Sequence, residues 1–230
     1  MTREFDLIAI GTGSAASGVT SRCREAGWRV AIVDSRPFGG TCALRGCDPK
    51  KVLVGAAEAL DWTRRMNGKG IHAAELQIDW PELMRFKRSF TEPVTKRRED
   101  DFARAGIAAF HGRARFAGPT TVQVGEETLQ GRYVVIAAGA APADLGIPGA
   151  EHLTTSDQFL ELNQLPRRIL FIGGGYIAFS LRMSRRLRDR RSLSYIVARA
   201  LLHILNPISL NSSSSGLANL ASTFISKPLR

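Results

Sequence analysis

Two cysteines, Cys42 and Cys47, stand close together in residues 39–51, whose sequence is GGTCALRGCDPKK. On a regular helix this spacing separates them along the axis by about 7.5 Å, beyond the usual Cα reach of a disulfide. Gly46 and Pro49 permit a backbone distortion that closes the gap. A bridge held in this way is strained and easily reduced, as a catalytic one must be. The spacing therefore predicts a redox-active, catalytic dithiol.

The surroundings of the two cysteines indicate activated thiols. A helix N-terminus together with Arg45, Lys50 and Lys51 is expected to lower a thiol pKa and favour the thiolate. Two other interpretations stay open: both cysteines are small buried hydrophobic residues, or they are half of a zinc site. Zinc needs further ligands at short spacing, whereas the next histidines are His72 and His111. The third cysteine of the chain is interpreted as an ordinary helix residue.

A glycine turn near the N-terminus is the second motif that indicates chemistry. Gly11-x-Gly13-x-x-Ala16 follows an apolar run and opens a predicted helix at Ser14. The first glycine permits a tight turn, the second lets the backbone approach a pyrophosphate, and the small third residue lets helix pack on strand. Asp34, at the end of the next predicted strand, is placed to accept hydrogen bonds from a ribose. The motif predicts dinucleotide binding, and a structural turn without a ligand is the alternative.

The segments that must position these motifs alternate between strand and helix. The predicted elements, in chain order, are an apolar strand at 5–10, a helix to residue 26, a strand at 30–33, a helix at 50–66, a charged and mostly helical segment at 80–110, short antiparallel strands within 112–130, a buried strand at 133–137, a linker at 142–149 and a strand at 168–172. This alternation is typical of an α/β fold with a parallel sheet.

Residues 39–51 resemble the G-G-T-C-x-x-x-G-C-x-P-x-K motif of the class I pyridine nucleotide-disulfide oxidoreductases, which include glutathione reductase, dihydrolipoamide dehydrogenase and mercuric reductase. The resemblance implies that Cys42 is the interchange thiol that attacks the substrate's disulfide. It implies that Cys47 faces the flavin, that its thiolate and the flavin form a charge-transfer pair, and that Lys51 stabilises the reduced flavin. Lys50 stands where the family usually has Ser or Thr.

Three further segments resemble the same family. Residues 111–114 are similar to the segment whose backbone contacts the adenine of FAD, residues 137–142 to an A-T-G-x-x-P turn with Ala138 in place of Thr, and residues 169–178 to the start of the NAD(P) domain. The cofactors implied are FAD and NAD(P)H. The cofactor-binding residues expected from the glycine turn and the resemblance together are Gly11, Gly13, Ser14, Ala16, Asp34, Gly40, Thr41, Lys51, Ala114, Ala138, Gly139, Gly173, Gly175, Tyr176 and Ile177.

The resemblance implies an α/β fold with a FAD-binding Rossmann-like domain, a parallel sheet and an incomplete second nucleotide-binding unit. Residues 1–147 form the expected FAD-binding domain with the dithiol, and 148–179 the start of the NAD(P)-binding domain. The resemblance ends there, because Ser180 stands where the family has a glutamate that positions the nicotinamide. The second strand of the NAD(P) unit and the family's dimerisation domain are not recognised. The NAD(P)H site is therefore expected to be incomplete, and the family's homodimer is not expected.

Residues 180–230 form a divergent, basic and Ser-rich tail. Residues 181–230 hold nine of the 32 Lys and Arg and one of the 21 acidic residues, so the rest of the chain is close to neutral despite the net charge of +11. The arginine run at 182–191 is typical of nucleic-acid or anionic-lipid binding, and the apolar residues 193–205 could lie on a membrane. A shifted reading frame, with disorder or poor packing, fits the abrupt loss of the family pattern best.

Composition bounds the function. The chain has 230 residues, 44% of them hydrophobic, which suits one good-sized domain or two small ones. No secretory signal is recognised and three cysteines are too few for a structural disulfide framework, so a cytoplasmic location is expected.

The leading hypothesis is electron transfer from NAD(P)H through FAD and Cys42-Cys47 to a small disulfide or metal-ion substrate. The alternatives are an inactive fragment that at best binds FAD, and a nucleic-acid-binding protein acting through its tail. Neither nucleic acid nor a membrane is the expected partner.

Overall fold

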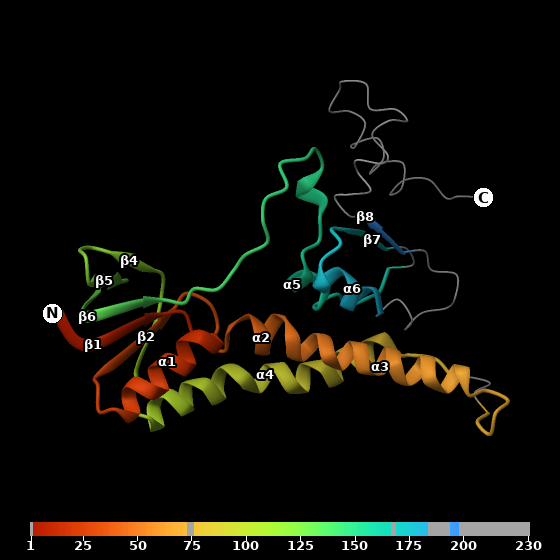
Figure 1. The fold of residues 1–230 in the computed structure, drawn as a ribbon, viewed down its shortest axis with the longest axis horizontal. Coiled ribbons are helices and arrows are strands. Elements are labelled where there is room, and N and C mark those ends of the chain that lie inside the picture. Colours follow the sequence, from red (N-terminus) through yellow and green to blue (C-terminus); the bar gives the residue numbers. More distant parts are fainter. Residues whose placement is uncertain (1, 73–75, 167–168, 184–193, 198–230) are drawn as a thin grey trace. The chain divides into compact units, whose positions relative to one another are not determined.

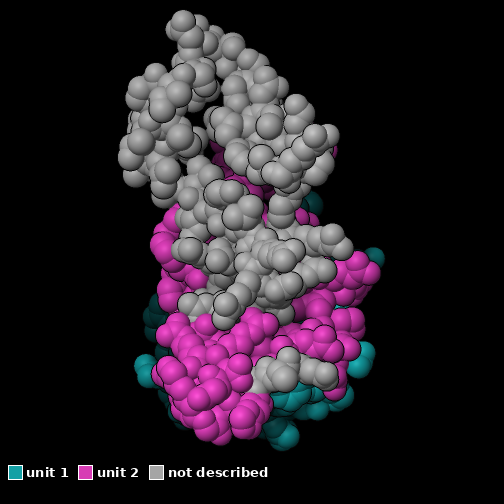
Figure 2. All heavy atoms as spheres, turned by 90° about the vertical axis from the view of Figure 1, so that its right-hand side faces the viewer, with its two compact units in different colours: residues 1–52, 84–140 teal, residues 53–83, 141–230 magenta. Residues whose placement is uncertain are grey.

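The computed structural model describes residues 2–72, 76–166, 169–183 and 194–197 (Figure 1). The chain divides into two compact units, coloured separately in Figure 2. Unit 1 contains residues 1–52 and 84–140, and unit 2 contains residues 53–83 and 141–230. Each unit is described below by itself.

Unit 1 contains a six-stranded sheet with the order β3-β2-β1-β6-β5-β4. Its strands are β1 (Thr2–Ile10), β2 (Val30–Asp34), β3 (Ala108–His111), β4 (Ala114–Phe116), β5 (Thr121–Val124) and β6 (Glu127–Ile136). The first four strands in the spatial order are mutually parallel, whereas β5 pairs antiparallel with β6 and with β4. The predicted parallel sheet and the short antiparallel strands are both confirmed.

Helices connect the parallel strands. They are α1 (Ser14–Glu25), α2 (Gly40–Arg45), α3 (Cys47–Arg65) and α4 (Trp80–Arg104). Helix α1 joins β1 to β2, and the chain passes through the other three before it enters β3. Since parallel strands need such crossovers, the order of elements by itself brings the carboxyl ends of β1, β2 and β3 to one edge of the sheet.

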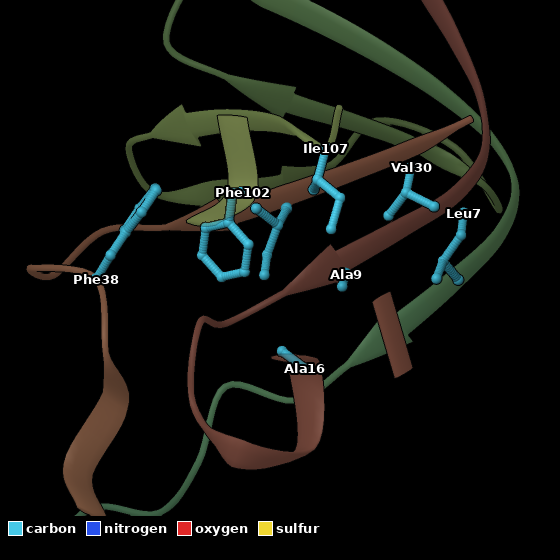
Figure 3. Packing of buried hydrophobic residues seen from close by; sticks show 8 residues of the cluster. Leu7, Ala9, Ala16, Val30, Phe38, Phe102 and Ile107 are labelled. Atoms are coloured by element: carbon cyan, nitrogen blue, oxygen red, sulfur yellow. The ribbon is translucent and has the colours of Figure 1, made fainter. Parts of the chain in front are cut away.

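Two hydrophobic clusters cover the two faces of the sheet. Leu7 and Ala9 of β1 pack on one face with Ala16 of α1 and Phe102 of α4 (Figure 3). Ile8, which points to the opposite face, packs in a second cluster with residues of the antiparallel strands. This alternation follows from the two-residue period of a strand. Residues 30–33 of β2 are all buried because both faces of this strand are covered.

The predicted helical segment at 80–110 needs correction. Helix α4 ends at Arg104, Gly106 has φ +68°, and residues 108–111 form β3 beside β2. A glycine in the left-handed region ends the helix and lets the chain turn into the sheet. Although the helix is rich in charged residues, Met84, Lys87 and Phe102 are buried.

Unit 2 has a two-stranded parallel sheet of β7 (Ile169–Ile172) and β8 (Ser194–Val197), with α6 (Tyr176–Met183) between them in sequence. It also contains the 3-10 helix η1 (Ala150–His152) and α5 (Ser156–Phe159). Trp80 Nε1 donates a 2.8 Å hydrogen bond to the Leu162 carbonyl, and the Phe159 and Phe171 rings lie 6.3 Å apart.

The expectation that the strand and helix pattern stops at residue 179 is wrong in the described part of the tail. Helix α6 continues to Met183, and β8 pairs in register from Ile169–Ser194 to Ile172–Val197. The sequence Ser-Tyr-Ile-Val is rich in residues that favour strands, but the arginine run before it hid this pattern. Most of that run, together with the Ser-rich segment, lies outside the described residues.

None of the helices in the described residues is both long enough and apolar enough to cross a membrane.

Candidate functional site

The glycine turn after β1 is pressed against the end of β6. Gly11 has φ +112°, and its N–H donates a 2.6 Å hydrogen bond to the Val33 carbonyl. A Cβ at this position would approach the Ala137 carbonyl closer than 3.0 Å. The first glycine of the motif is therefore required by both its conformation and its surroundings.

The same turn touches the start of the dithiol segment. Gly40 has φ +70°, and a Cβ on it would fall within 3.0 Å of the Gly13 Cα. The two backbones approach this closely because Gly40 has no side chain, whereas a Cβ on Gly13 would make only an ordinary 3.7 Å contact with the Gly40 Cα. Two motifs that are separate in the sequence thus meet at one edge of the unit 1 sheet.

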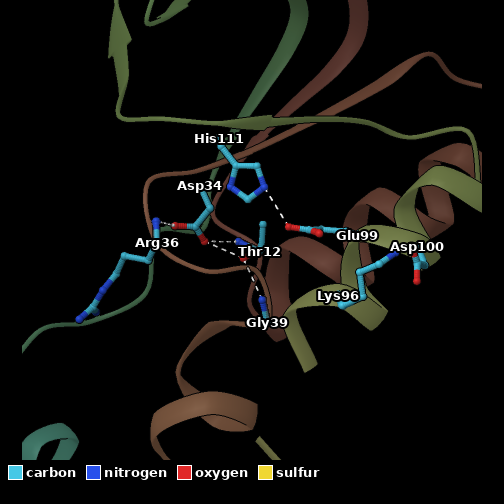
Figure 4. A network of polar contacts seen from close by, with 8 residues as sticks. All are labelled: Thr12, Asp34, Arg36, Gly39, Lys96, Glu99, Asp100 and His111. Carbon is cyan, nitrogen blue, oxygen red and sulfur yellow. Dashed lines mark hydrogen bonds and ion pairs between the residues drawn. The ribbon is translucent and has the colours of Figure 1, made fainter. Parts of the chain in front are cut away.

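Asp34 lies at the end of β2, in the position predicted to bind a ribose (Figure 4). Its Oδ2 accepts hydrogen bonds from the backbone N–H and the side-chain hydroxyl of Thr12, at 2.9 and 2.7 Å, and its Oδ1 accepts from the Arg36 N–H at 3.0 Å. A carboxylate offers about four acceptor positions, so capacity remains for a further donor. Sequence reasoning did not identify Thr12, which occupies the unspecified second position of the glycine motif.

His111 extends the polar edge beside Asp34, its partner in the β2–β3 register. Its ring stacks on Phe38 with centroids 3.9 Å apart, and its Nε2 lies 3.1 Å from Glu99 Oε1 of α4 (Figure 4). Phe38 is fully buried. Phe38 thus packs the end of β3 against the loop that leads to the dithiol, and Glu99 links the same end to α4. Sequence reasoning missed both residues.

The dithiol spans a break between two helices. Cys42 lies in α2, Cys47 is the first residue of α3, and Gly46 between them has φ −142° and ψ −110°. A Cβ on Gly46 would stand 2.9 Å from the Thr41 carbonyl oxygen. The break at Gly46 agrees with the predicted backbone distortion, while the predicted bridge stays a prediction, because both cysteines are free thiols here. Their side chains are within hydrogen-bonding reach of each other.

The predicted lowering of a thiol pKa is wrong for Cys42. Its pKa is raised, first by the hydrogen bond with Cys47, then by partial burial and by the negative charges of Cys47 and Asp48. A hydrogen bond that favours the protonated thiol raises its pKa. The prediction counted the basic residues but not Asp48, whose Oδ1 lies 4.0 Å from Lys51 Nζ.

Replacing Cys47 by Ala is expected to lower the pKa of Cys42, because it removes the largest cause of the rise. Alkylation of Cys42, which requires the thiolate, should then begin at lower pH than in the parent chain. The measurement is the rate of iodoacetamide labelling at Cys42 against pH, followed by peptide mass spectrometry. Replacing Cys23, which packs on the first cluster, by Ala provides the control. An unmoved Cys42 profile in the Cys47 variant would contradict the assigned cause.

The other predicted site residues are distributed over both units. Ser14 is the first residue of α1, and Ala16 is a buried residue of the same helix. Thr41 follows Gly40 in α2, and the side chain of Lys51 is 75% exposed. Ala114 packs against the second cluster. Ala138 and Gly139 follow β6, and Gly139 has φ +80° with open space where a Cβ would be. In unit 2, Gly173, Gly175, Tyr176 and Ile177 form the turn after β7 and the first residues of α6.

The unit 1 residues fit a dinucleotide. Helix α1 is 12 residues long, its N-cap Gly13 provides no side-chain cap, and no acidic residue lies in its first turn. The helix therefore presents uncapped N–H donors, which suit a pyrophosphate. Asp34 retains acceptor capacity beside this end. Among the described residues, no three metal-ligating side chains gather in one place.

Comparison with known proteins decides which family has this arrangement. The family profile described as pyridine nucleotide-disulphide oxidoreductase matches residues 5–201. The chain belongs to this family. The match confirms the resemblance carried by the dithiol motif and extends beyond residue 179, where the sequence interpretation ended it.

Individual family members agree with this assignment. The chain is 36% identical to a glutathione reductase of Burkholderia cepacia over 175 residues, which cover 76% of this chain and 39% of that protein. It is 32% identical to a mercuric reductase of Staphylococcus aureus, covering 77% of this chain and 33% of that protein. The chain thus spans less than half the length of these curated relatives.

A solved structure has the same fold. The Cu(II) complex of the HOCl-induced flavoprotein disulfide reductase RclA from Escherichia coli superposes with a TM-score of 0.72 at 24% identity, covering 85% of this chain and 42% of that chain. At this identity the likeness supports the fold alone.

Proposed function

We propose that unit 1 binds FAD and that Cys42 and Cys47 form its redox partner. The N-terminus of α1 would hold the pyrophosphate, and Asp34 would accept a hydrogen bond from the ribose. Support comes from the uncapped helix end, the side-chain-free backbone at Gly13, and the remaining acceptor capacity of Asp34.

One observation carries the proposal: the dithiol segment begins directly against the glycine turn. Gly40 packs on Gly13, and the Gly39 N–H donates a 3.2 Å hydrogen bond to the Thr12 hydroxyl. A structural turn and an unrelated pair of cysteines would not need to meet. A flavin nucleotide site and a dithiol that exchanges electrons with it must meet.

The proposed reaction is the two-electron reduction of a disulfide or metal-ion substrate by NAD(P)H. Bound FAD would supply hydride acceptance from the nicotinamide and pass the electron pair to the cysteine disulfide. For a disulfide substrate, the Cys42 thiolate attacks one sulfur and the first substrate thiolate leaves. The Cys47 thiolate then attacks Cys42 and displaces the second, so the substrate is reduced and the protein dithiol oxidised.

The order of these roles depends on the family resemblance. Cys47 is exposed and Cys42 is half-buried, so exposure alone would favour attack by Cys47. Proximity supports the exchange itself, since the two thiols already lie within hydrogen-bonding reach. The substrate class is proposed from the relatives, one named for glutathione and one for mercuric ion.

Nicotinamide binding is proposed for unit 2. Strand β7, a turn at Gly173 with φ +108°, helix α6 and parallel strand β8 form a strand-helix-strand unit of the kind that binds nucleotides. Ser180 stands where the resemblance expects a glutamate, so we propose an incomplete site in which hydride transfer is slow. Flavin binding without turnover is therefore the second candidate function.

Titration of the purified full chain with FAD tests the proposal. Flavin absorbance is expected to remain with the protein after gel filtration, and a colourless protein in excess FAD would refute flavin binding. Anaerobic NADPH or NADH is then added to the yellow protein. Bleaching of the flavin supports hydride transfer from the nicotinamide to FAD, the first step of the electron path, whereas bound flavin that stays oxidised supports the second candidate function.

A further inference from the structure

The Thr12 side chain lies between Asp34, the carboxylate proposed to bind the ribose, and the loop that precedes the dithiol. It is 1% exposed, and each of its polar groups is engaged within unit 1 (Figure 4). Its N–H and hydroxyl both donate to Asp34 Oδ2, the hydroxyl oxygen accepts from the Gly39 N–H, and its carbonyl accepts from the Ser17 hydroxyl at 3.3 Å. One buried hydroxyl therefore joins two functional segments.

The geometry restricts what the hydroxyl can do. A threonine hydroxyl has one hydrogen, and here it points to Asp34 at 2.7 Å. Its oxygen must then act as the acceptor toward Gly39 at 3.2 Å. A change in the orientation of Asp34 would therefore alter the hydrogen bond that holds Gly39, the residue directly before α2 and two positions before Thr41.

The Gly39 N–H depends on the Thr12 hydroxyl as its hydrogen-bond acceptor. Gly39 is buried with φ +136°, and Val94 and Leu44 surround the position where its side chain would be. A buried N–H that loses its acceptor in such surroundings bears the full desolvation penalty. The Thr12 hydroxyl therefore stabilises the loop through Gly39 and also donates a hydrogen bond to Asp34.

We infer that Thr12 is a positioning residue that links the ribose acid Asp34 to the loop preceding the dithiol. This inference rests on the proposed binding of FAD in unit 1. Thr12 orients Asp34 toward the ribose, and through Gly39 it fixes the start of the helix that carries Cys42. Occupation of the adenosine end of the site is thereby coupled to the accessibility of the dithiol.

A double-mutant cycle tests the link to Asp34. Thr12→Val is expected to weaken FAD binding, measured by quenching of flavin fluorescence, by about tenfold because it removes both hydroxyl hydrogen bonds. In the Asp34→Ala background the same change should cost about threefold or less, since the partner is already gone. Thr12→Ser, which keeps the hydroxyl, should bind like the parent. Equal effects of Thr12→Val in both backgrounds would overturn the inference.

Alkylation tests the link to Gly39. Iodoacetamide labelling of Cys42 at fixed pH is expected to be at least about fivefold faster in Thr12→Val than in the parent, because the loop loses a buried hydrogen bond. Thr12→Ser should label like the parent. Saturating FAD should slow labelling in the parent and in Thr12→Ser, and more weakly in Thr12→Val. Unchanged labelling in Thr12→Val would overturn the inference.

The two proposals fail in different ways. If the parent chain binds no FAD, flavin binding is refuted and the inference falls with it. If the parent binds FAD and Thr12→Val binds it equally well, the inference alone is refuted. Should Thr12→Val not fold, as judged by circular dichroism, Thr12→Ala removes the same hydroxyl without a branched side chain, and the same comparisons apply.

Discussion

Mild oxidation of the reduced chain is expected to consume two of its three thiols and to leave Cys23. Cys42 and Cys47 lie within hydrogen-bonding reach across the break at Gly46, so they can join without separating the two helices. Cys23 lies in α1 and packs against the first hydrophobic cluster. The measurement is the thiol count before and after oxidation, with peptide mass spectrometry to identify the linked pair.

Replacement of either partner should abolish the internal bridge completely. Cys47→Ser is expected to keep both remaining thiols after the same treatment of dilute protein, and so is Cys42→Ser. Cys23→Ser is the matched control, because it removes one thiol of the same type and should leave bridge formation at the parental level. A bridge that involves Cys23, or thiols at residues 42 and 47 that resist oxidant in the folded chain, would remove the basis of the proposed electron path.

The dithiol also shows where sequence reasoning succeeds. Its residue types and spacing are local properties, so the motif fixes a break at Gly46 and the approach of the two thiols, and the structure confirms both. The glycine turn is equally local. Gly11 adopts φ +112° where the motif requires a conformation that other residues avoid. Strongly patterned segments of this kind specify their own geometry.

The features that were missed depend on tertiary contacts. Nothing in the sequence near Thr12 shows that Gly39 would approach it, since their hydrogen bond depends on how the two loops pack. The raised pKa of Cys42 likewise depends on Cys47 and Asp48 in space, whereas the sequence suggested the opposite direction from its basic neighbours. Strand β3 was absorbed into a helical prediction because it is only four residues long, follows a long charged helix and has a single buried residue, Phe110.

Strand β8 gives a related lesson about composition. An arginine-rich stretch suggested that the α/β pattern had ended, but Ser194–Val197 pairs with β7 and the family profile continues to residue 201. The net charge of a segment indicates its solubility and its binding partners but not its fold. Four consecutive residues that favour strands can therefore still pair with a parallel strand after a charged stretch. Local pattern is therefore the better guide at this point of the chain.

Replacing Gly11 by Ala is expected to destabilise unit 1 by about 3–5 kcal/mol, which combines left-handed backbone strain with overpacking. The new Cβ would approach the Ala137 carbonyl closer than 3.0 Å at φ +112°. This is a large part of the about 5–15 kcal/mol that stabilises a typical domain, so FAD binding should be lost as well. Hydrogen exchange of the β1 and β2 amides measures the loss in unit 1 specifically.

Gly18 offers the matched control for this change. It lies within α1, it is exposed, and a Cβ there would have open space around it. Gly18→Ala is therefore expected to stabilise unit 1 by about 0.5–1 kcal/mol, because alanine loses less backbone entropy in a helix. Both variants add one methyl group, Gly18→Ala within α1 and Gly11→Ala three residues before its first residue, yet the changes in amide protection should have opposite signs. If Gly11→Ala keeps parental protection of β1, the end of β6 must move away, and the close packing of the glycine turn on the sheet, on which the proposed pyrophosphate site depends, would be disproved.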